Sequence, residues 1–157
     1  MSATTAPASA TDARHQQGID PRGPQFTAAI TAVVLIAVLL LPPFVAGVLT
    51  AVQAVLFAIG ATRGVQHTVH AALFKRFVRP RLAAPSELED PAPPRFAQAV
   101  GLAFTAVALI GYATGLTLLG QIAIGFALVA ALLNAIFRFC LGCELYLLIK
   151  RVTHQTT

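Results

Sequence analysis

The chain has 157 residues, of which 57% are apolar and 11% are charged, and its mean hydropathy is +0.76. This composition excludes an ordinary soluble domain and predicts an integral membrane protein surrounded by membrane lipid. The net charge of +5 does not indicate nucleic-acid binding, because the basic residues flank apolar segments and carry no interleaved aromatic platform on which bases could stack. We therefore expect no nucleic-acid partner.

The first stretch, residues 1–23, is rich in Ala, Thr, Ser, Gln and Pro and has no apolar periodicity. Such a segment cannot bury enough apolar surface to offset the conformational entropy that is lost on ordering. It predicts a disordered N-terminal tail.

The next segment, residues 24–82, begins with a long apolar window that has no charged residue before Arg63. Pro42-Pro43 interrupts this window, and two consecutive prolines remove two backbone donors and disfavour a continuous helix. The window therefore predicts a hairpin with spans at Gln25–Leu41 and Phe44–Thr62, near the lower limit of the length that crosses a bilayer. A basic segment completes this first unit.

A Pro-rich, acidic linker is expected at residues 83–95, followed by a second window without charge. A glycine-containing stretch divides this window into spans at Phe96–Thr114 and Leu118–Phe137. The second hairpin unit covers residues 96–151 and ends in a C-x-x-C segment, leaving a C-terminal tail at residues 152–157. The predicted fold class is all-α, an integral membrane four-helix bundle.

The distribution of Lys and Arg predicts the orientation of this bundle. Basic residues precede the first span, occupy the segment between the hairpins and follow the last span, whereas the two hairpin tips carry none. By the positive-inside rule, both termini and the central segment are expected in the cytoplasm. The C-x-x-C segment would then face the cytoplasm as well.

The two hairpins also resemble each other. Pro24-Gln25-Phe26 matches Pro94-Arg95-Phe96 at the start of each unit, and Arg63 matches Arg138 at the end of each second span. Because both hairpins enter and leave on one side, duplication would give a parallel repeat about an axis along the membrane normal. The alternative is that any two apolar hairpins look alike.

Cys140 and Cys143 are the only cysteines, and their spacing places both sulfurs on one helix face. If the last span continues through them, the negative helix end and Glu144 disfavour thiolates. If the helix breaks at Gly142, Cys143 gains the positive end of a new helix, and Arg138 adds to its activation. The alternative is that both are small residues used in helix packing.

A second candidate is His67-Thr68-Val69-His70, at nearly the equivalent place in the first hairpin unit. Facing Cys140 and Cys143, His67 and His70 would complete a Cys₂His₂ zinc site. The alternative is that the histidines are polar anchors at the membrane interface. Apart from this zinc alternative, no cofactor is expected.

Arg63 and Arg138 end their spans at equivalent positions. Because Arg binds oxyanions in a bidentate manner, the pair could attract a small anion to the mouth of the bundle. The alternative is that both side chains extend to lipid phosphates.

Four stretches of the chain are distinctive: Ile19-Asp20-Pro21-Arg22-Gly23-Pro24, Val78-Arg79-Pro80-Arg81-Leu82, Glu87-Leu88-Glu89-Asp90-Pro91-Ala92-Pro93-Pro94-Arg95-Phe96 and Phe139-Cys140-Leu141-Gly142-Cys143-Glu144-Leu145-Tyr146. In these stretches the chain resembles a bacterial membrane family, common in actinobacteria, that is catalogued as domain of unknown function 4395. The resemblance covers about residues 17–151 and implies a location in the bacterial inner membrane.

More distantly, each hairpin is similar to the two-helix membrane domain that accompanies rhodanese in some sulfurtransferases. Cys140 matches the cysteine of that domain, with Leu141 in place of its usual proline. The resemblance implies thioredoxin-like or sulfurtransferase partners, and hence sulfur or thiol-redox metabolism.

The sequence thus predicts that Cys140 and Cys143 exchange electrons or sulfane sulfur with a soluble partner, with passage of a small sulfur anion as an additional role. Cys143 would be the attacking or acceptor thiol and Cys140 the resolving one, with Arg138 and Glu144 modulating them. The alternatives are a non-catalytic membrane subunit or scaffold, and a metal or small-solute transporter. Transport through four short spans would need a homodimer.

Overall fold

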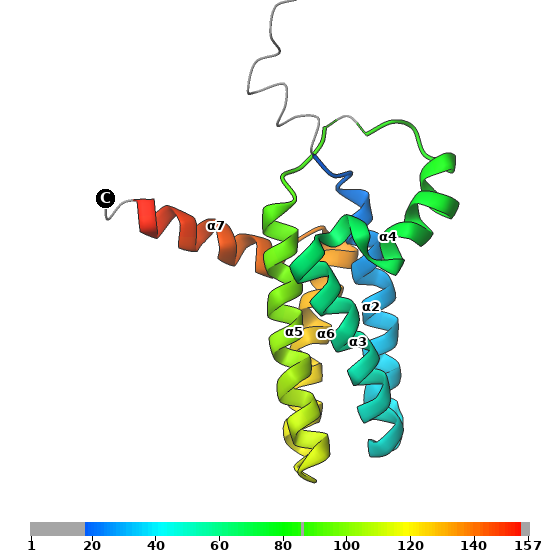
Figure 1. Ribbon diagram of the computed structural model, residues 1–157, viewed down its shortest axis with the longest axis vertical. Coiled ribbons are helices and arrows are strands. Elements are labelled where there is room, and N and C mark those ends of the chain that lie inside the picture. Colours follow the sequence, from blue (N-terminus) through cyan, green and yellow to red (C-terminus); the bar gives the residue numbers. More distant parts are fainter. Residues whose placement is uncertain (1–17, 86, 155–157) are drawn as a thin grey trace, which may run out of the picture.

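The computed structural model describes residues 18–85 and 87–154. Within these residues, four helices are long and apolar enough to cross a membrane (Figure 1). They confirm the four predicted spans, with ends that differ from the prediction by a few residues. The four helices are α2 (Arg22–Leu40), α3 (Pro43–Arg63), α5 (Ala92–Ala113) and α6 (Thr117–Phe137).

The four helices form the predicted bundle, in which each helix runs antiparallel to the one before it. Helix α2 packs on α3 and α6, and α5 packs on the same two helices. Consequently α2 and α5 begin, and α3 and α6 finish, at one end of the bundle, which we call the polar end. The two hairpin turns lie at the opposite end (Figure 1). The duplication of the hairpins stays a prediction.

The helix boundaries follow from local chemistry. Pro42 precedes α3, and Pro43 is its first residue, a position where the missing proline N–H breaks no intrahelical bond. Between α5 and α6, Gly115 takes a φ of +80°, a conformation that favours glycine. Both turns are therefore short, and they hold the paired spans close together.

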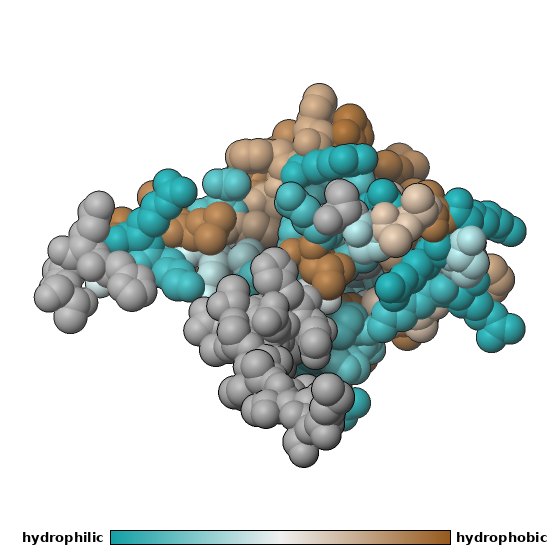
Figure 2. Space-filling model, turned by 90° about the horizontal axis from the view of Figure 1, so that it is seen from above, coloured by the Kyte–Doolittle hydropathy of each residue, from teal (hydrophilic) through white to brown (hydrophobic). Residues whose placement is uncertain are grey.

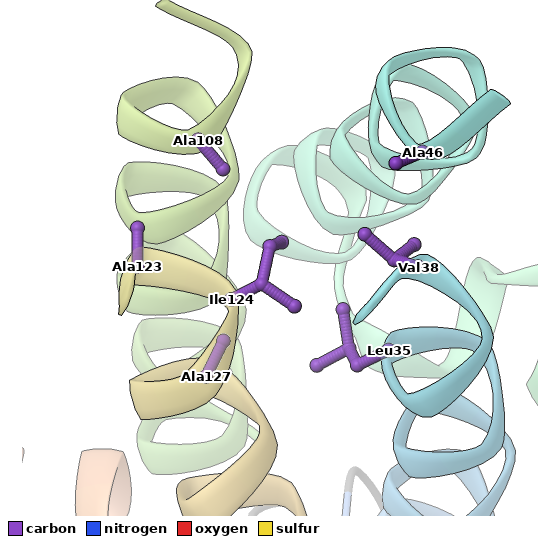
Figure 3. Close-up of a cluster of buried hydrophobic side chains, with 7 residues drawn as sticks. All are labelled: Leu35, Val38, Ala46, Ala108, Ala123, Ile124 and Ala127. Atoms are coloured by element: carbon purple, nitrogen blue, oxygen red, sulfur yellow. The ribbon is translucent and has the colours of Figure 1, made fainter. Parts of the chain in front are cut away.

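The core of the bundle combines a few large side chains with many small ones (Figure 3). Leu35 and Val38 of α2 face Ile124 of α6 and are almost fully buried. A Cβ on Gly111 of α5 would lie 2.6 Å from the backbone nitrogen of Gly120 of α6, so glycine there permits close helix approach. Small residues at the contacts are typical of helices that associate within a membrane.

The outer surface of the spans is apolar. Large side chains that are more than half exposed occur on all four spans, among them Val33, Val55, Ile110 and Phe126. Exposed apolar side chains around a whole bundle match a hydrocarbon surrounding. Figure 2, which looks onto the polar end, shows hydrophilic residues gathered there.

The segment between α3 and α5 folds back over the polar end. After α3 come the short helices η1 (Val65–His67), α4 (Val69–Leu73), the π-helix η2 (Phe74–Val78) and η3 (Arg79–Arg81). The linker that follows is shorter than the predicted residues 83–95, because α5 already begins at Ala92.

The predicted disordered tail also requires correction at its end. Residues 1–17 lie outside the described residues, but Ile19 and Glu89 exchange two backbone hydrogen bonds of 2.9 Å, and α2 starts at Arg22. The Arg22 guanidinium donates to the Ala83 carbonyl at 3.0 Å. Residues 18–23 are thus ordered by pairing with the linker, a contact far away in the sequence.

The C-terminal part forms one more helix, α7 (Leu141–His154), which extends into the segment predicted as a tail. It is separated from α6 by residues 138–140 and runs roughly across the bundle axis (Figure 1). The helix break therefore precedes Gly142, the position considered in the sequence, and Gly142 is part of α7.

Candidate functional site

The turn between α6 and α7 positions the cysteines. Arg138 takes φ 57° and ψ 23°. This left-handed conformation commonly ends a helix and is usually adopted by glycine. The amides of Arg138 and Phe139 donate to the carbonyls of Asn134 and Leu133 at 3.1 and 3.2 Å. These bonds close α6 and redirect the chain, so that α7 starts three residues later.

Cys140 and Cys143 form a disulfide at the start of α7. Cys140 directly precedes the helix, and its sulfur accepts a hydrogen bond of 3.3 Å from the amide of Cys143. The sulfur of Cys140 thus occupies the N-cap position, where the free amides and the helix dipole stabilise negative charge. Once the disulfide opens, the geometry favours thiolate on Cys140 more than on Cys143.

Gly142 holds this disulfide against α5. A Cβ at Gly142 would approach the Cα and Cβ of Ala97 to 2.6 Å, which leaves no room for a side chain. One turn further along, the rings of Tyr146 and Phe96 pack with their centroids 5.8 Å apart. The glycine between the cysteines therefore allows close packing of α7 on α5.

A polar cleft of about 550 Å³ at the polar end has both cysteines in its wall. Its other walls come from the start of α2, from the linker and from the end of α6. Its charged lining residues are two arginines and four acids: Arg22, Arg138, Glu87, Glu89, Asp90 and Glu144. Carboxylates outnumber guanidinium groups, so the cleft favours a cationic rather than an anionic visitor.

The predicted arginine pair is divided between two places. Arg138 lines the polar cleft, whereas Arg63 ends α3 and does not belong to its lining. The end of α3 is capped instead by Arg95, whose guanidinium donates to the carbonyls of Ala61 and Thr62 at 2.6 Å each. The charge balance of the cleft gives the predicted anion role of Arg138 no support.

The predicted zinc site of His67, His70, Cys140 and Cys143 does not form. No group of three or more His, Cys, Asp and Glu side chains is close enough to share a metal in the part of the chain that the structure describes. The cysteines are joined to each other, and Nδ1 of His67 lies 2.7 Å from the Arg63 carbonyl oxygen.

His70 lies in α4, outside the membrane spans, and is buried. Burial removes water from the imidazole and lowers the pKa of His70 below its usual 6.5, which favours the neutral form. A buried neutral histidine fits a packing role at the polar end better than that of an exposed polar anchor.

The two hairpin units use the same kind of break at different residues. After α3, Gly64 has φ 96°, and Thr68 caps α4 by accepting a hydrogen bond of 3.2 Å from the amide of Ala71. After α6, Cys140 caps α7 through the amide of Cys143. A threonine hydroxyl therefore plays in the first unit the part that a sulfur plays in the second.

Comparison with protein-family models finds a match to the family described as "Domain of unknown function (DUF4395)" over residues 19–151. The chain belongs to the DUF4395 family. Comparisons with curated proteins and with solved structures find no match.

Three of the stretches that carry the DUF4395 resemblance meet in the polar cleft. The start of α2 contributes Arg22, the linker contributes Glu89, and the start of α7 contributes both cysteines. Of these three stretches, only the one with the cysteines was a candidate site in the sequence. The other two lie far from it along the chain, and the signal that could have linked them was their shared enrichment in charge and proline.

Proposed function

We propose that this DUF4395 protein is a membrane-bound thiol–disulfide relay, whose Cys140–Cys143 disulfide accepts electrons from a soluble dithiol protein. The observation that carries the proposal is the placement of a disulfide at the first turn of α7, in the wall of an open polar cleft. A disulfide buried for stability alone would not need access from such a cleft, whereas an exchanging disulfide does.

We further propose that the polar end faces the cytoplasm of a bacterial cell. The ends of the spans there carry Arg22, Arg63, Arg95 and Arg138, while no Lys or Arg occurs in the hairpin turns at the opposite end. Such an asymmetry follows the positive-inside rule. In this orientation, reduced thioredoxin-like proteins of the cytoplasm meet the polar cleft directly.

The exchange proceeds in two steps. A thiolate of the partner attacks the sulfur of Cys143, a bond forms between the two sulfurs, and the bond between Cys143 and Cys140 breaks. Cys140 leaves as a thiolate, because the amide of Cys143 and the N-terminus of α7 stabilise its charge. The second thiol of the partner then displaces Cys143, which leaves an oxidised partner and a Cys140/Cys143 dithiol.

In this order of events Cys143 is the acceptor, as the sequence predicted, but Cys140 is the activated thiol rather than a passive resolving one. The cleft also defines the partner. Because its carboxylates outnumber its arginines, a thioredoxin-like protein with basic residues around its active-site cysteine fits best.

A trapping experiment tests this assignment. The oxidised protein is incubated in detergent with a reduced thioredoxin whose second active-site cysteine is replaced by serine, and free thiols are then blocked with N-ethylmaleimide. We expect a mixed disulfide on Cys143 and maleimide on Cys140. Fragmentation of the tryptic peptide of residues 139–150, which contains both cysteines, distinguishes the two positions by mass spectrometry.

Two variants provide the controls. Neither Cys140→Ser nor Cys143→Ser has a disulfide to be attacked, so neither should form the adduct. Absence of an adduct with the oxidised wild-type protein, or an adduct mainly on Cys140, would contradict the proposed exchange.

A further inference from the structure

A second cavity lies behind the disulfide, inside the bundle. It has a volume of about 260 Å³ and is lined by residues from all four spans and from the start of α7. Most of its lining is apolar, including Phe57, Phe104 and Phe126. Cys140 lines both this cavity and the polar cleft, whereas Cys143 lines the cleft only. The disulfide therefore separates a polar entrance from an apolar interior.

This cavity reaches the lipid-facing surface of the bundle. Two of its lining residues on α6 are largely exposed, Phe126 at 62% and Val129 at 54%. Leu145 of α7, which also lines it, is exposed at 44%. Since these side chains belong to the apolar outer surface, a molecule that enters between them comes from the bilayer and not from water.

The interior of the cavity contains an unsatisfied polar group. Thr31 of α2 lines it, is only 3% exposed, and its hydroxyl has no hydrogen-bond partner. A buried hydroxyl without a partner costs free energy, unless a ligand supplies the missing acceptor or donor. Gln98 and Asn134, both with amide donors, also line the cavity.

We propose that this cavity binds the ring of a lipid-soluble quinone, which oxidises the Cys140/Cys143 dithiol. A quinone meets three requirements of this site. It enters from the lipid, and its oxygen atoms accept hydrogen bonds from Thr31 and from the amides of Gln98 and Asn134. It can also take two electrons from a dithiol in the cavity wall. The cavity is slightly smaller than the usual range for small-molecule pockets, so it accommodates the ring while the isoprenoid tail stays in the lipid.

The reaction balances without a further reactant. The two thiols lose two electrons and two protons, and the S–S bond between Cys140 and Cys143 forms again. The quinone takes up both electrons and both protons on its two carbonyl oxygens and becomes a quinol. Membrane quinones serve as oxidants of protein dithiols in bacteria. This inference rests on the proposed relay and names the acceptor to which the relay passes its electrons.

The experiment measures the quinone step apart from the partner step. The purified protein is reduced with dithiothreitol in detergent, freed of excess reductant, and mixed with decylubiquinone or, in a parallel sample, menadione. We expect each chain to reduce one equivalent of quinone and to lose two thiols. The change in the ultraviolet absorption of the quinone measures its reduction. The quinone step is overturned if the thiols persist and the quinone absorption does not change.

Two threonine variants test the site. Thr31→Val removes the unpartnered hydroxyl at nearly constant shape and should raise the decylubiquinone concentration that gives half of the maximal oxidation rate about three- to ten-fold, the range of one hydrogen bond. Thr50→Val is the control, because the Thr50 hydroxyl already donates to the Ala46 carbonyl at 2.7 Å and Thr50 does not line the cavity. Equal half-saturating concentrations of decylubiquinone for the two variants would contradict the assignment of the cavity.

A third variant addresses occupancy of the cavity by a lipid chain alone. Ala131→Phe fills the cavity from α6, and Ala106→Phe adds the same ring at an exposed position of α5 outside it. We expect only Ala131→Phe to slow quinone reduction, while both variants still react with thioredoxin. Unchanged quinone reduction in Ala131→Phe would overturn the proposal. If thioredoxin fails to react with any form, the relay fails but the quinone result stands by itself.

Discussion

Cys140 has two structural positions at once. It is the N-cap of α7, where the amide of Cys143 reaches its sulfur at 3.3 Å, and it lies between the polar cleft and the apolar cavity. The first position stabilises a thiolate on Cys140 once the disulfide is reduced. The second places the Cys140 side chain in the walls of both the cleft and the cavity. In the proposed exchange, the backbone around Cys140 is therefore what stabilises its thiolate.

At the same scale, His70 predicts a pH dependence of stability. Because the pKa of His70 is lowered on folding, the unfolded chain takes up a proton first as the pH falls, and stability is lost below the usual value of 6.5. Between pH 7.5 and 5.5 the free energy of unfolding should fall by at most about 1.4 kcal/mol per pH unit. Circular dichroism melts in detergent at a series of pH values measure it.

The matched variants are His70→Leu and His67→Leu. His67 is exposed in η1, so its replacement should leave the pH dependence in place, whereas His70→Leu should flatten it. The melting temperature of the wild-type protein should therefore fall across this range. If it does not change, protonation of His70 does not lower the free energy of unfolding, and the prediction is wrong.

Single residues show which parts of the site could be predicted from the sequence. The cysteine pair was found by its spacing, and its position at the end of a span was correct. The break at Arg138 was not predicted, because glycine is the usual sequence signal of a left-handed residue at a helix end. Here Arg138 takes that conformation instead. Thr31 was not found either, because its missing partner becomes visible only when all the neighbouring spans are in place.

At the scale of elements, the spans could be predicted because the physics of the bilayer is local. Charge-free windows and a Pro-Pro turn determine where helices cross hydrocarbon, without knowledge of their neighbours. Helix α7 is different, since its start depends on packing against α5. From the sequence, a break at Gly142 was one of two alternatives, whereas in the structure Gly142 brings α7 into contact with Ala97.

This role makes the glycine testable. Gly142→Ala places a methyl group 2.6 Å from atoms of Ala97, so α7 must shift, and we expect a loss of about 1–3 kcal/mol of stability. Gly125→Ala is the control, because a Cβ there meets nothing within 4 Å and alanine favours the interior of α6 by about 0.5–1 kcal/mol. Thermal melts of both variants in the same detergent give the comparison.

We expect Gly142→Ala to lower the melting temperature and Gly125→Ala to raise it. If Gly142→Ala melts at or above the wild-type temperature, close packing of α7 on α5 is not what the glycine provides. Accelerated reduction of the disulfide by dithiothreitol should accompany the destabilisation, since a displaced α7 exposes both sulfurs.

At the scale of the whole molecule, both cysteines and the charged lining of the polar cleft lie at the polar end. Ile19 pairs with Glu89, Arg22 donates to Ala83, and Gln25 donates to the Ala135 carbonyl at 2.9 Å, so the start of α2, the linker and the end of α6 meet. These contacts bridge large separations in sequence, and single-chain patterns cannot predict them. The sequence predicted the polar end as a membrane boundary, and the structure adds a cleft.

The central claim is that a protein dithiol on the cytoplasmic side reduces the Cys140–Cys143 disulfide. The most direct measurement uses sealed inverted vesicles from quinone-depleted membranes and, as the matched sample, right-side-out vesicles of the same membranes, each incubated with thioredoxin, thioredoxin reductase and NADPH. Maleimide mass tagging then counts the thiols of each chain. We predict two new thiols per chain in inverted vesicles only. A disulfide that stays oxidised in inverted vesicles, or is reduced only in right-side-out ones, would contradict the account.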